Sequence, residues 1–210
     1  MGIYTIGELA LSDIFVLRKT FKSFGDVLYN NANGIGSDLV GGFEQVREFK
    51  SMGNSSTLPY DVKIREEAYV ALLSLSEIVS ASLRNYGVLA GEIAVTLKTS
   101  DFKVYSHMKR LEENIDCTKA VFLYSCEVFD EMWEGEPIRQ IGIRAERFSQ
   151  ERYIQLSLFG RDWDKYRKAD FAADEIRLKY GDEAVLRSAL LKSPFYIKDR
   201  DRLEINNTIF

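Results

Sequence analysis

The chain has 210 residues, of which 46% are hydrophobic, 12% aromatic and 29% charged, which is enough apolar material for one substantial core and a smaller satellite. The formal net charge of −4 argues mildly against nucleic-acid binding, because proteins that bind phosphates usually carry an excess of Lys and Arg. The apolar runs are too short for a membrane span and the N-terminus lacks the layout of a signal peptide, so we expect a cytoplasmic protein with no membrane partner.

The first segment, residues 1–36, has the pattern of short helices broken by glycines, with Asp13 and Asp26 placed to support helix starts. This segment is too small to fold independently. The short segment 37–43 contains two glycines, which is typical of a linker. We therefore expect a domain boundary in this linker.

A pattern of strands and longer helices follows and predicts one domain over residues 44–152. In chain order we expect a strand at 44–52, a turn at 53–59, a helix at 63–86, strands at 92–98 and 102–110 joined by a hairpin at 99–101, a helix at 118–133 and a strand at 138–145. Gly87 is placed to end the first helix. The order β-α-β-β-α-β predicts an α+β fold, in which a four-stranded sheet carries two helices on one face and leaves the other face open.

Alternation along the strands separates the two faces of this sheet. One face of the strand at 92–98 is apolar and is expected in the core: Ile93, Val95 and Leu97. In the last strand, Gln140 and Arg144 are expected to point outward. A polar face of the strand at 102–110 contains Lys103, Tyr105, His107 and Lys109. Since acids gather in the second helix and bases in the strands, an open basic sheet could bind DNA although the whole chain is acidic.

Catalytic chemistry is not indicated by the residues of this chain. Nucleotidyl transfer with two metal ions needs clustered carboxylates, and the nearest acidic pairs, such as the one in 199–201, are expected to be solvated charges of the tail. His107 is the single histidine, so a multi-histidine metal site is excluded. We expect no catalytic residue, no metal site and no cofactor in the chain.

A short apolar motif follows the domain, at residues 153–160. Its residues are Gln155, Leu156, Ser157, Leu158 and Phe159. Leu158 and Phe159 could anchor in a pocket of a partner while Gln155 bonds at its rim. The alternative is a terminal strand whose leucines lie in the core. The remaining residues, 161–210, predict a charged helical tail with a helix at about 162–180.

Three segments stand in an order similar to that in the C-terminal halves of bacterial Y-family translesion DNA polymerases, the ImpB-MucB-SamB type. They are Lys50 to Pro59, Lys98 to Phe102 and Pro137 to Ile143. Residues 2–10 and 32–35 also resemble the end of the helix-hairpin-helix thumb of that family, so 1–36 would be a partial thumb and Met1 would fall inside a domain. Two departures are His107, where the family often has arginine, and Gly36, where it usually has aspartate.

This resemblance implies that 44–152 is a little-finger domain, which lays its sheet on primer-template DNA. The contacts that we expect come from Lys50, Ser51, Asn54, Lys98, Thr99, Ser100, Lys103, Tyr105, Ser106, His107 and Arg144. Such groups hold the DNA backbone without reading sequence, and their binding weakens with salt. Without the resemblance, these would be ordinary exposed residues of a solvated sheet.

The resemblance also implies a second partner, the bacterial sliding clamp, which would bind Gln155 to Phe159. The parent protein would be a Mg²⁺-dependent DNA polymerase of the SOS and lesion-bypass pathway, with its catalytic carboxylates in a palm that precedes residue 1. The alternative is a stand-alone adaptor that binds the clamp through the same motif and uses its sheet for another protein.

Overall fold

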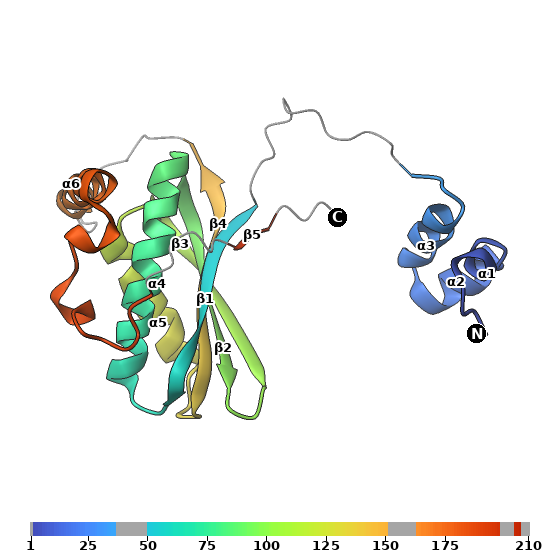
Figure 1. The fold of residues 1–210 in the computed structure, drawn as a ribbon, viewed down its shortest axis with the longest axis horizontal. Helices are drawn as coiled ribbons and strands as arrows, with labels where there is room; N and C mark the ends of the chain where they lie inside the picture. Colours follow the sequence, from blue (N-terminus) through green and yellow to red (C-terminus); the bar gives the residue numbers. More distant parts are fainter. Residues whose placement is uncertain (1, 37–49, 151–162, 198–203, 207–210) are drawn as a thin grey trace. The chain divides into compact units, whose positions relative to one another are not determined.

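The structure, a computed structural model, describes residues 2–36, 50–150, 163–197 and 204–206 (Figure 1). By their internal contacts the residues form two compact units, Met1–Arg47 and Glu48–Phe210.

The first unit contains three short helices, α1 (Ile6–Ala10), α2 (Ile14–Phe21) and α3 (Phe24–Ala32). Asp13 begins α2, because its carboxylate accepts a hydrogen bond from the backbone N–H of Phe15 at 2.8 Å. Gly25 allows α3 to pack closely on α2, because a Cβ at this position would lie 2.6 Å from the carbonyl carbon of Leu17. Leu17 is fully buried, whereas many apolar side chains of the unit are exposed.

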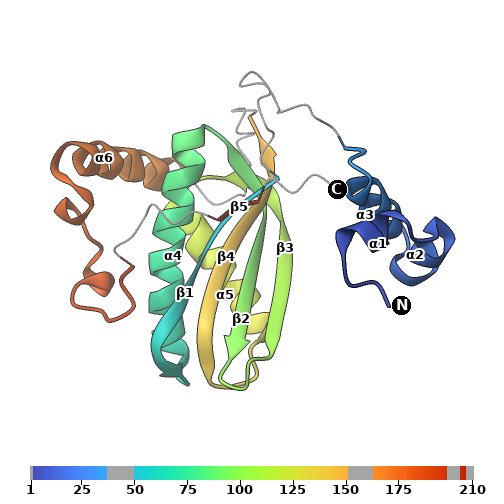
Figure 2. The same ribbon diagram turned by 45° about the vertical axis from the view of Figure 1, so that its right-hand side comes forward.

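The second unit is built on an antiparallel sheet (Figures 1 and 2). Its main strands are β1 (Ser51–Val62), β2 (Leu89–Thr99), β3 (Val104–Ile115) and β4 (Ile138–Ser149). Within the described residues the strand order is β3-β2-β4-β1-β5, where β5 (Glu204–Asn206) is a short edge strand that we did not expect. Helices α4 (Arg65–Tyr86) and α5 (Thr118–Met132) cover one face. The predicted α+β fold is confirmed.

Strand β1 corrects one prediction. The segment 53–59 is not a turn, because Gly53, Asn54 and Ser55 pair with the central strand β4 in an antiparallel ladder. Its glycine, serine and proline content is typical of turns, but pairing with a neighbouring strand overrides such local preference. The predicted strand at 44–52 begins at residues outside the described ranges. Helix α4 ends as predicted, since Gly87 adopts φ +66°.

The core lies between the covered face of the sheet and the two helices. Ile93, Val95 and Leu97 of β2 are buried there, as their alternation predicts. From the helices, Leu72 and Phe129 are fully buried, and the ring of Phe129 stacks on Trp133 at a centroid distance of 5.2 Å. None of the described helices of this unit lies over the opposite sheet face (Figure 2).

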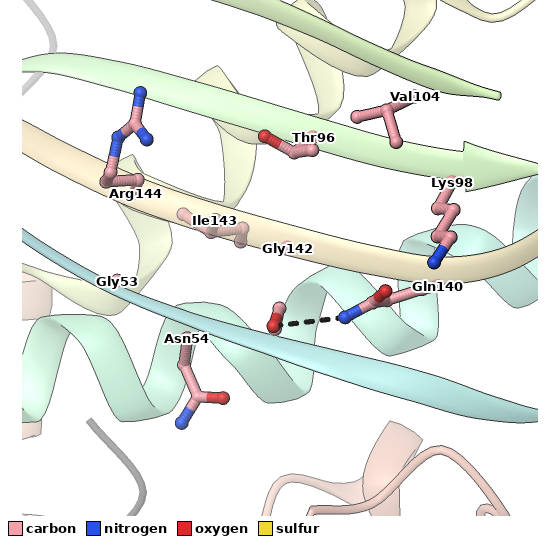
Figure 3. Close-up of a pocket in the computed structure, with 10 residues that line it drawn as sticks. Gly53, Asn54, Thr96, Lys98, Val104, Gln140, Gly142, Ile143 and Arg144 are labelled. Atoms are coloured by element: carbon pink, nitrogen blue, oxygen red, sulfur yellow. Dashed lines mark hydrogen bonds between the residues drawn. The ribbon is translucent and has the colours of Figure 1, made fainter. Parts of the chain in front are cut away.

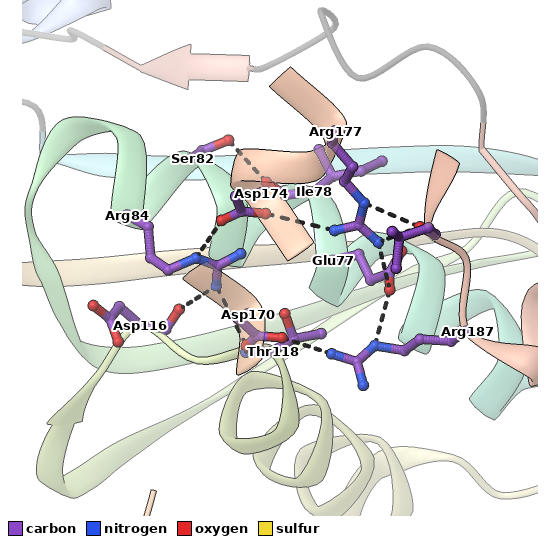
Figure 4. A network of polar contacts seen from close by, with 11 residues as sticks. Glu77, Ile78, Ser82, Arg84, Asp116, Thr118, Asp170, Asp174, Arg177 and Arg187 are labelled. Atoms are coloured by element: carbon purple, nitrogen blue, oxygen red, sulfur yellow. Dashed lines mark hydrogen bonds and ion pairs between the residues drawn. The ribbon is translucent and has the colours of Figure 1, made fainter. Parts of the chain in front are cut away.

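The tail also packs on this unit. It forms α6 (Asp164–Tyr180), which confirms the predicted helix, and two short 3₁₀ turns at Asp182–Ala184 and Ser188–Leu190. Side chains of α6 and of the following turns meet α4 in a buried ionic cluster, which we call the tail network (Figure 4). Its members are Glu77, Arg84, Asp170, Asp174, Arg177 and Arg187.

Candidate nucleic-acid interface

The open face of the sheet carries its side chains in four rows that run across β3, β2, β4 and β1. From the β2–β3 hairpin inward, the rows are Val104, Lys98, Gln140 and Thr57; Ser106, Thr96, Gly142 and Ser55; Met108, Ala94, Arg144 and Gly53; and Arg110, Glu92, Glu146 and Ser51. The residues between them in sequence, such as Val95 and Ile143, point to the core. Most members of the first three rows are small or polar.

A shallow groove of about 340 Å³ crosses the middle of this face (Figure 3). Its floor includes Gly53 and Gly142, and a Cβ at Gly142 would lie 3.0 Å from the Cβ of Ser55. Gln140 donates a hydrogen bond to the Ser55 hydroxyl at 3.3 Å along one wall. Because glycines and short side chains form the floor, a ligand can come close to the sheet at this point.

Positive charge borders the groove at two places. Lys98 projects from β2, and its Nζ lies 5.0 Å from the centre of the Phe102 ring. Among the described residues Lys98 has no carboxylate partner. Arg144 of β4, in contrast, has its Nε 2.5 Å from a carboxylate oxygen of Glu146. At the hairpin end of the groove, Lys98 therefore has no carboxylate partner among the described residues, whereas Arg144 at the other end is neutralised by Glu146.

Comparison with known proteins identifies this arrangement. Residues 49–158 match the model of the impB/mucB/samB family C-terminal domain. The chain belongs to this family. DNA polymerase IV of Clostridium acetobutylicum is 36% identical over 193 residues, which cover 91% of this chain and 48% of that protein. DNA polymerase IV 2 of Bacillus subtilis is 33% identical over 195 residues, which cover 91% of this chain and 47% of that protein.

The chain thus spans about half the length of the curated relatives it matches. Among solved structures, the Y-family DNA polymerase chimera Dbh-Dpo4(243-245)-Dbh has a TM-score of 0.55 at 19% identity, over 71% of this chain and 42% of that chain. This likeness shows a shared fold. The sheet with its two helices is therefore the little-finger fold of Y-family polymerases, as the resemblance implies.

In this impB/mucB/samB C-terminal domain, the expected contact residues fall into three groups. The first group lies on the open face: Ser51, Lys98, Ser106 and Arg144. Ser106 is exposed, and its hydroxyl lies 3.1 Å from that of Thr96 in the same row. Lys50 is exposed just before β1 begins.

The second group lies on the helix-covered side, contrary to expectation. Tyr105 and His107 share a face, but they stand opposite Leu97 and Val95, which are core residues. His107 Nε2 lies 3.2 Å from a carboxylate oxygen of Glu131 in α5. Asn54 stands opposite the buried Ile143 in the register and is 5% exposed, yet it also lines the groove (Figure 3). Tyr105 and His107 therefore lie on the covered side of β3 rather than on the open face.

The third group builds the β2–β3 hairpin. The Thr99 hydroxyl donates to Asp101 and to the backbone carbonyl of Lys103, the latter at 3.2 Å, and the Ser100 N–H donates to the carbonyl of Pro137 at 3.0 Å. The hydrogen bond from Thr99, followed by that from Lys103, lowers the pKa of Asp101. These residues shape the turn that carries Lys98 and Lys103 at the end of the sheet.

Open-face residues that were missing from the expected contacts include Thr96, Gln140, Gly142 and Arg110. Alternation places Gln140 outward beside Arg144, and the structure confirms this. In β3, by contrast, the alternation of the sequence does not show which residues face the open side of the sheet. Val104 and Met108 are apolar yet lie on the open face, whereas Tyr105 and His107 are polar yet lie on the covered face.

The described residues show no group of three or more His, Cys, Asp or Glu side chains arranged to hold a metal ion. Cys117 and Cys126 are free and buried, and burial raises their thiol pKa values to about 11 and about 12. These thiols therefore stay protonated at neutral pH. Among the described helices, none combines the length and the hydropathy needed to cross a bilayer.

The motif from Gln155 to Phe159 lies outside the described residues. The elements on either side of it are described: β4 ends at Ser149, and α6 begins at Asp164. Trp163, just before α6, donates a hydrogen bond from its indole N–H to Glu113 of β3. Both flanks of the motif are thus attached to the same unit.

Proposed function

We propose that the open face of the sheet holds the sugar–phosphate backbone of primer-template DNA, as part of a lesion-bypass DNA polymerase. The observation that carries this proposal is the groove, which is lined by small residues such as Gly53 and Gly142 and whose rim carries Lys98. Hydroxyls and a lysine are typical donors to phosphate, and they position DNA without reading its sequence. This suits an enzyme that accepts any template.

The polymerase reaction itself belongs, in this proposal, to the part of such a protein that this chain does not include. The matched relatives are about twice as long and are named DNA polymerase IV. The whole protein would use Mg²⁺ and deoxynucleotides in the bacterial cytoplasm, within the SOS response to DNA damage. The present chain would contribute affinity for primer-template DNA and would help to position it.

A pair of lysines on opposite faces of the sheet tests the DNA grip. Lys98→Ala is expected to weaken binding to a fluorescent primer-template duplex by about three- to tenfold at low salt and to reduce the salt slope by about 1, because one phosphate contact is lost. Lys109→Ala removes the same charge from the covered side, where Nζ pairs with Glu127 at 3.2 Å and Glu131 at 3.1 Å. It is expected to leave binding unchanged.

Equal effects of the two lysine variants would show that net charge rather than the open face governs binding. Absence of binding by the wild-type chain at low salt would sink the DNA grip and favour the adaptor hypothesis, in which the sheet meets another protein.

We also propose that Gln155 to Phe159 dock on the bacterial sliding clamp. The support is the chemistry of the motif, with two large apolar anchors and a glutamine able to bond at the rim of a pocket. Clamp docking would raise the effective concentration of a weak polymerase at the primer end.

Replacement of both Leu158 and Phe159 by alanine is expected to weaken clamp binding at least about tenfold, because two apolar anchors are removed. The measurement is surface plasmon resonance on immobilised clamp, with the duplex titration as the control, which should not change. Loss of DNA binding in parallel would contradict the division of the chain into a DNA-binding sheet and a clamp-binding motif.

A further inference from the structure

The row of the open face farthest from the hairpin contains two glutamates side by side. Glu92 of β2 and Glu146 of β4 stand directly opposite each other in the register. Like charges at directly opposed positions of a sheet repel each other and destabilise the pair. On a surface that is to meet phosphates, two carboxylates are also repulsive to the ligand. Their presence in the middle of the row needs an explanation.

Two arginines neutralise this pair. Arg144 places its Nε 2.5 Å from a carboxylate oxygen of Glu146, and Arg147 places its Nε 3.4 Å from one of Glu92. The carboxylates lie deeper than the bases: the side chain of Glu92 is 12% exposed and that of Arg147 is 56% exposed. The arginines therefore cover the glutamates and are themselves at the surface.

The backbone at this point is shaped to bring Arg147 into place. Arg147 has φ +53°, in the left-handed region that side-chain-bearing residues seldom adopt. Gly91 of β2 lies beside it, and a Cβ at Gly91 would come within 3.1 Å of the Arg147 carbonyl oxygen. The positive φ of Arg147 is costly for a residue with a side chain, and the position beside it has little room for anything but glycine. This arrangement allows Arg147 to reach Glu92, which faces away from the core.

Each carboxylate lies against the Nε of its arginine, so the Nη donors remain for phosphate. A phosphate bound there would meet the negative charge of the adjacent glutamate, which offsets part of its attraction to the guanidinium. Lys98, at the hairpin end, has no such competitor among the described residues. Phosphate would therefore be bound more strongly at Lys98 than at Arg144 and Arg147.

We propose that Glu92 and Glu146 act as internal phosphate mimics, which occupy Arg144 and Arg147 and so limit the affinity of the open face for DNA. This inference rests on the proposed function and concerns the regulation of the same surface. The domain then holds DNA firmly near Lys98 and loosely near Arg144, which favours rapid release of the duplex after a short synthesis.

The test is Glu146→Gln in the full 210-residue chain. The amide keeps the size of the side chain but removes the charge that holds Arg144. Binding to the primer-template duplex is expected to become about three- to tenfold tighter at low salt, and the salt slope to become steeper by about 1, because one arginine is released to phosphate. Glu92→Gln should act in the same direction through Arg147, and its thermal unfolding would be checked first since the side chain is largely buried.

The matched control is Glu175→Gln, which makes the same change in net charge on an exposed position of α6. It is expected to leave the affinity unchanged within about twofold, because α6 packs against α4 on the helix-covered side of the sheet and not on the open face (Figure 2). Equal tightening by E146Q and E175Q would overturn the inference, and so would weaker binding by E146Q, which would mean that Glu146 positions Arg144 for DNA. A wild-type chain that depends on Lys98 but does not respond to E146Q would leave the DNA grip standing and remove this inference alone. If neither wild type nor E146Q binds the duplex, both the proposed DNA binding and the inference about the glutamates are wrong.

Discussion

Replacement of Arg84 by leucine is expected to lower the free energy of unfolding of the sheet unit by about 3–5 kcal/mol, the range for breaking a buried ion pair by removing one partner. The Arg84 side chain is 2% exposed. Its Nε lies 2.7 Å from Asp174, and its Nη1 donates to the backbone carbonyl of Asp116 at 2.9 Å. Leucine would remove the donor from the Asp116 carbonyl and one of the two cations beside Asp174, while it would recover part of the packing.

Denaturant unfolding followed by circular dichroism measures this loss. The matched control is Arg139→Leu, since Arg139 forms a two-point pair with Asp61 at 2.8 and 3.1 Å but its side chain is 46% exposed. Exposed pairs of this kind contribute about 0–1 kcal/mol, so the control is expected to be nearly neutral. Similar losses in the two variants would show that the tail network is no more stabilising than a surface pair.

Replacement of Gly25 by alanine is expected to unfold the small helical unit at the N-terminus. The added Cβ would lie 2.6 Å from the backbone carbon of Leu17 and 2.7 Å from its carbonyl oxygen, and backbone atoms cannot move aside as the end of a side chain can. Forcing extra volume into a packed contact costs about 1–3 kcal/mol. In a unit with one fully buried large apolar side chain among its described residues, Leu17, this is a large share of the stability.

Hydrogen exchange of the amides in α2 and α3 measures the effect within the intact chain. Gly7→Ala is the matched control: Gly7 lies inside α1, and a Cβ there meets no atom within 4 Å. Because alanine is a better helix former than glycine, this control is expected to stabilise the unit by about 0.5–1 kcal/mol. Protection that is unchanged in Gly25→Ala would contradict the close packing of α3 on α2.

The order of strands and helices was predictable because long amphipathic stretches carry a strong periodic signal. Helix α4 is the clearest case, with Leu72, Leu75 and Val79 spaced along one buried stripe and Gly87 at its end. Strand β1 was not predictable in the same way. Its residues favour turns locally, and its extended conformation depends on pairing with β4, about 90 residues later in the chain.

The candidate site was predictable in kind but not in detail. An open face with lysine, arginine and small polar residues follows from the topology, and Lys98, Ser106 and Arg144 lie on it. The parity of the edge strand β3 could not be predicted, because its two faces are of mixed polarity. For this reason the face on which His107 lies was not predicted correctly. Its partner in the structure, Glu131, belongs to α5 and lies 24 residues later in the chain.

The tail network was beyond sequence reasoning for a different cause. The sequence shows a charged tail, and charges in a tail are usually solvated. Arg177 instead lies buried beside Glu77, a residue separated from it by 100 positions. No local sequence pattern pairs these two residues, because they meet only where α6 packs against α4 in the folded chain (Figure 4).

The attachment of α6 has a mechanical consequence. Strand β4, in the middle of the sheet, is held by its hydrogen-bonded ladders, whereas α6 is held on α4 by the ion pairs of Arg84 and Arg177. A pull on the end of β4 is therefore resisted by backbone hydrogen bonds, and a pull on the start of α6 by side-chain ion pairs. The two elements would yield by different means, β4 by loss of its ladder and α6 by loss of its ionic contacts.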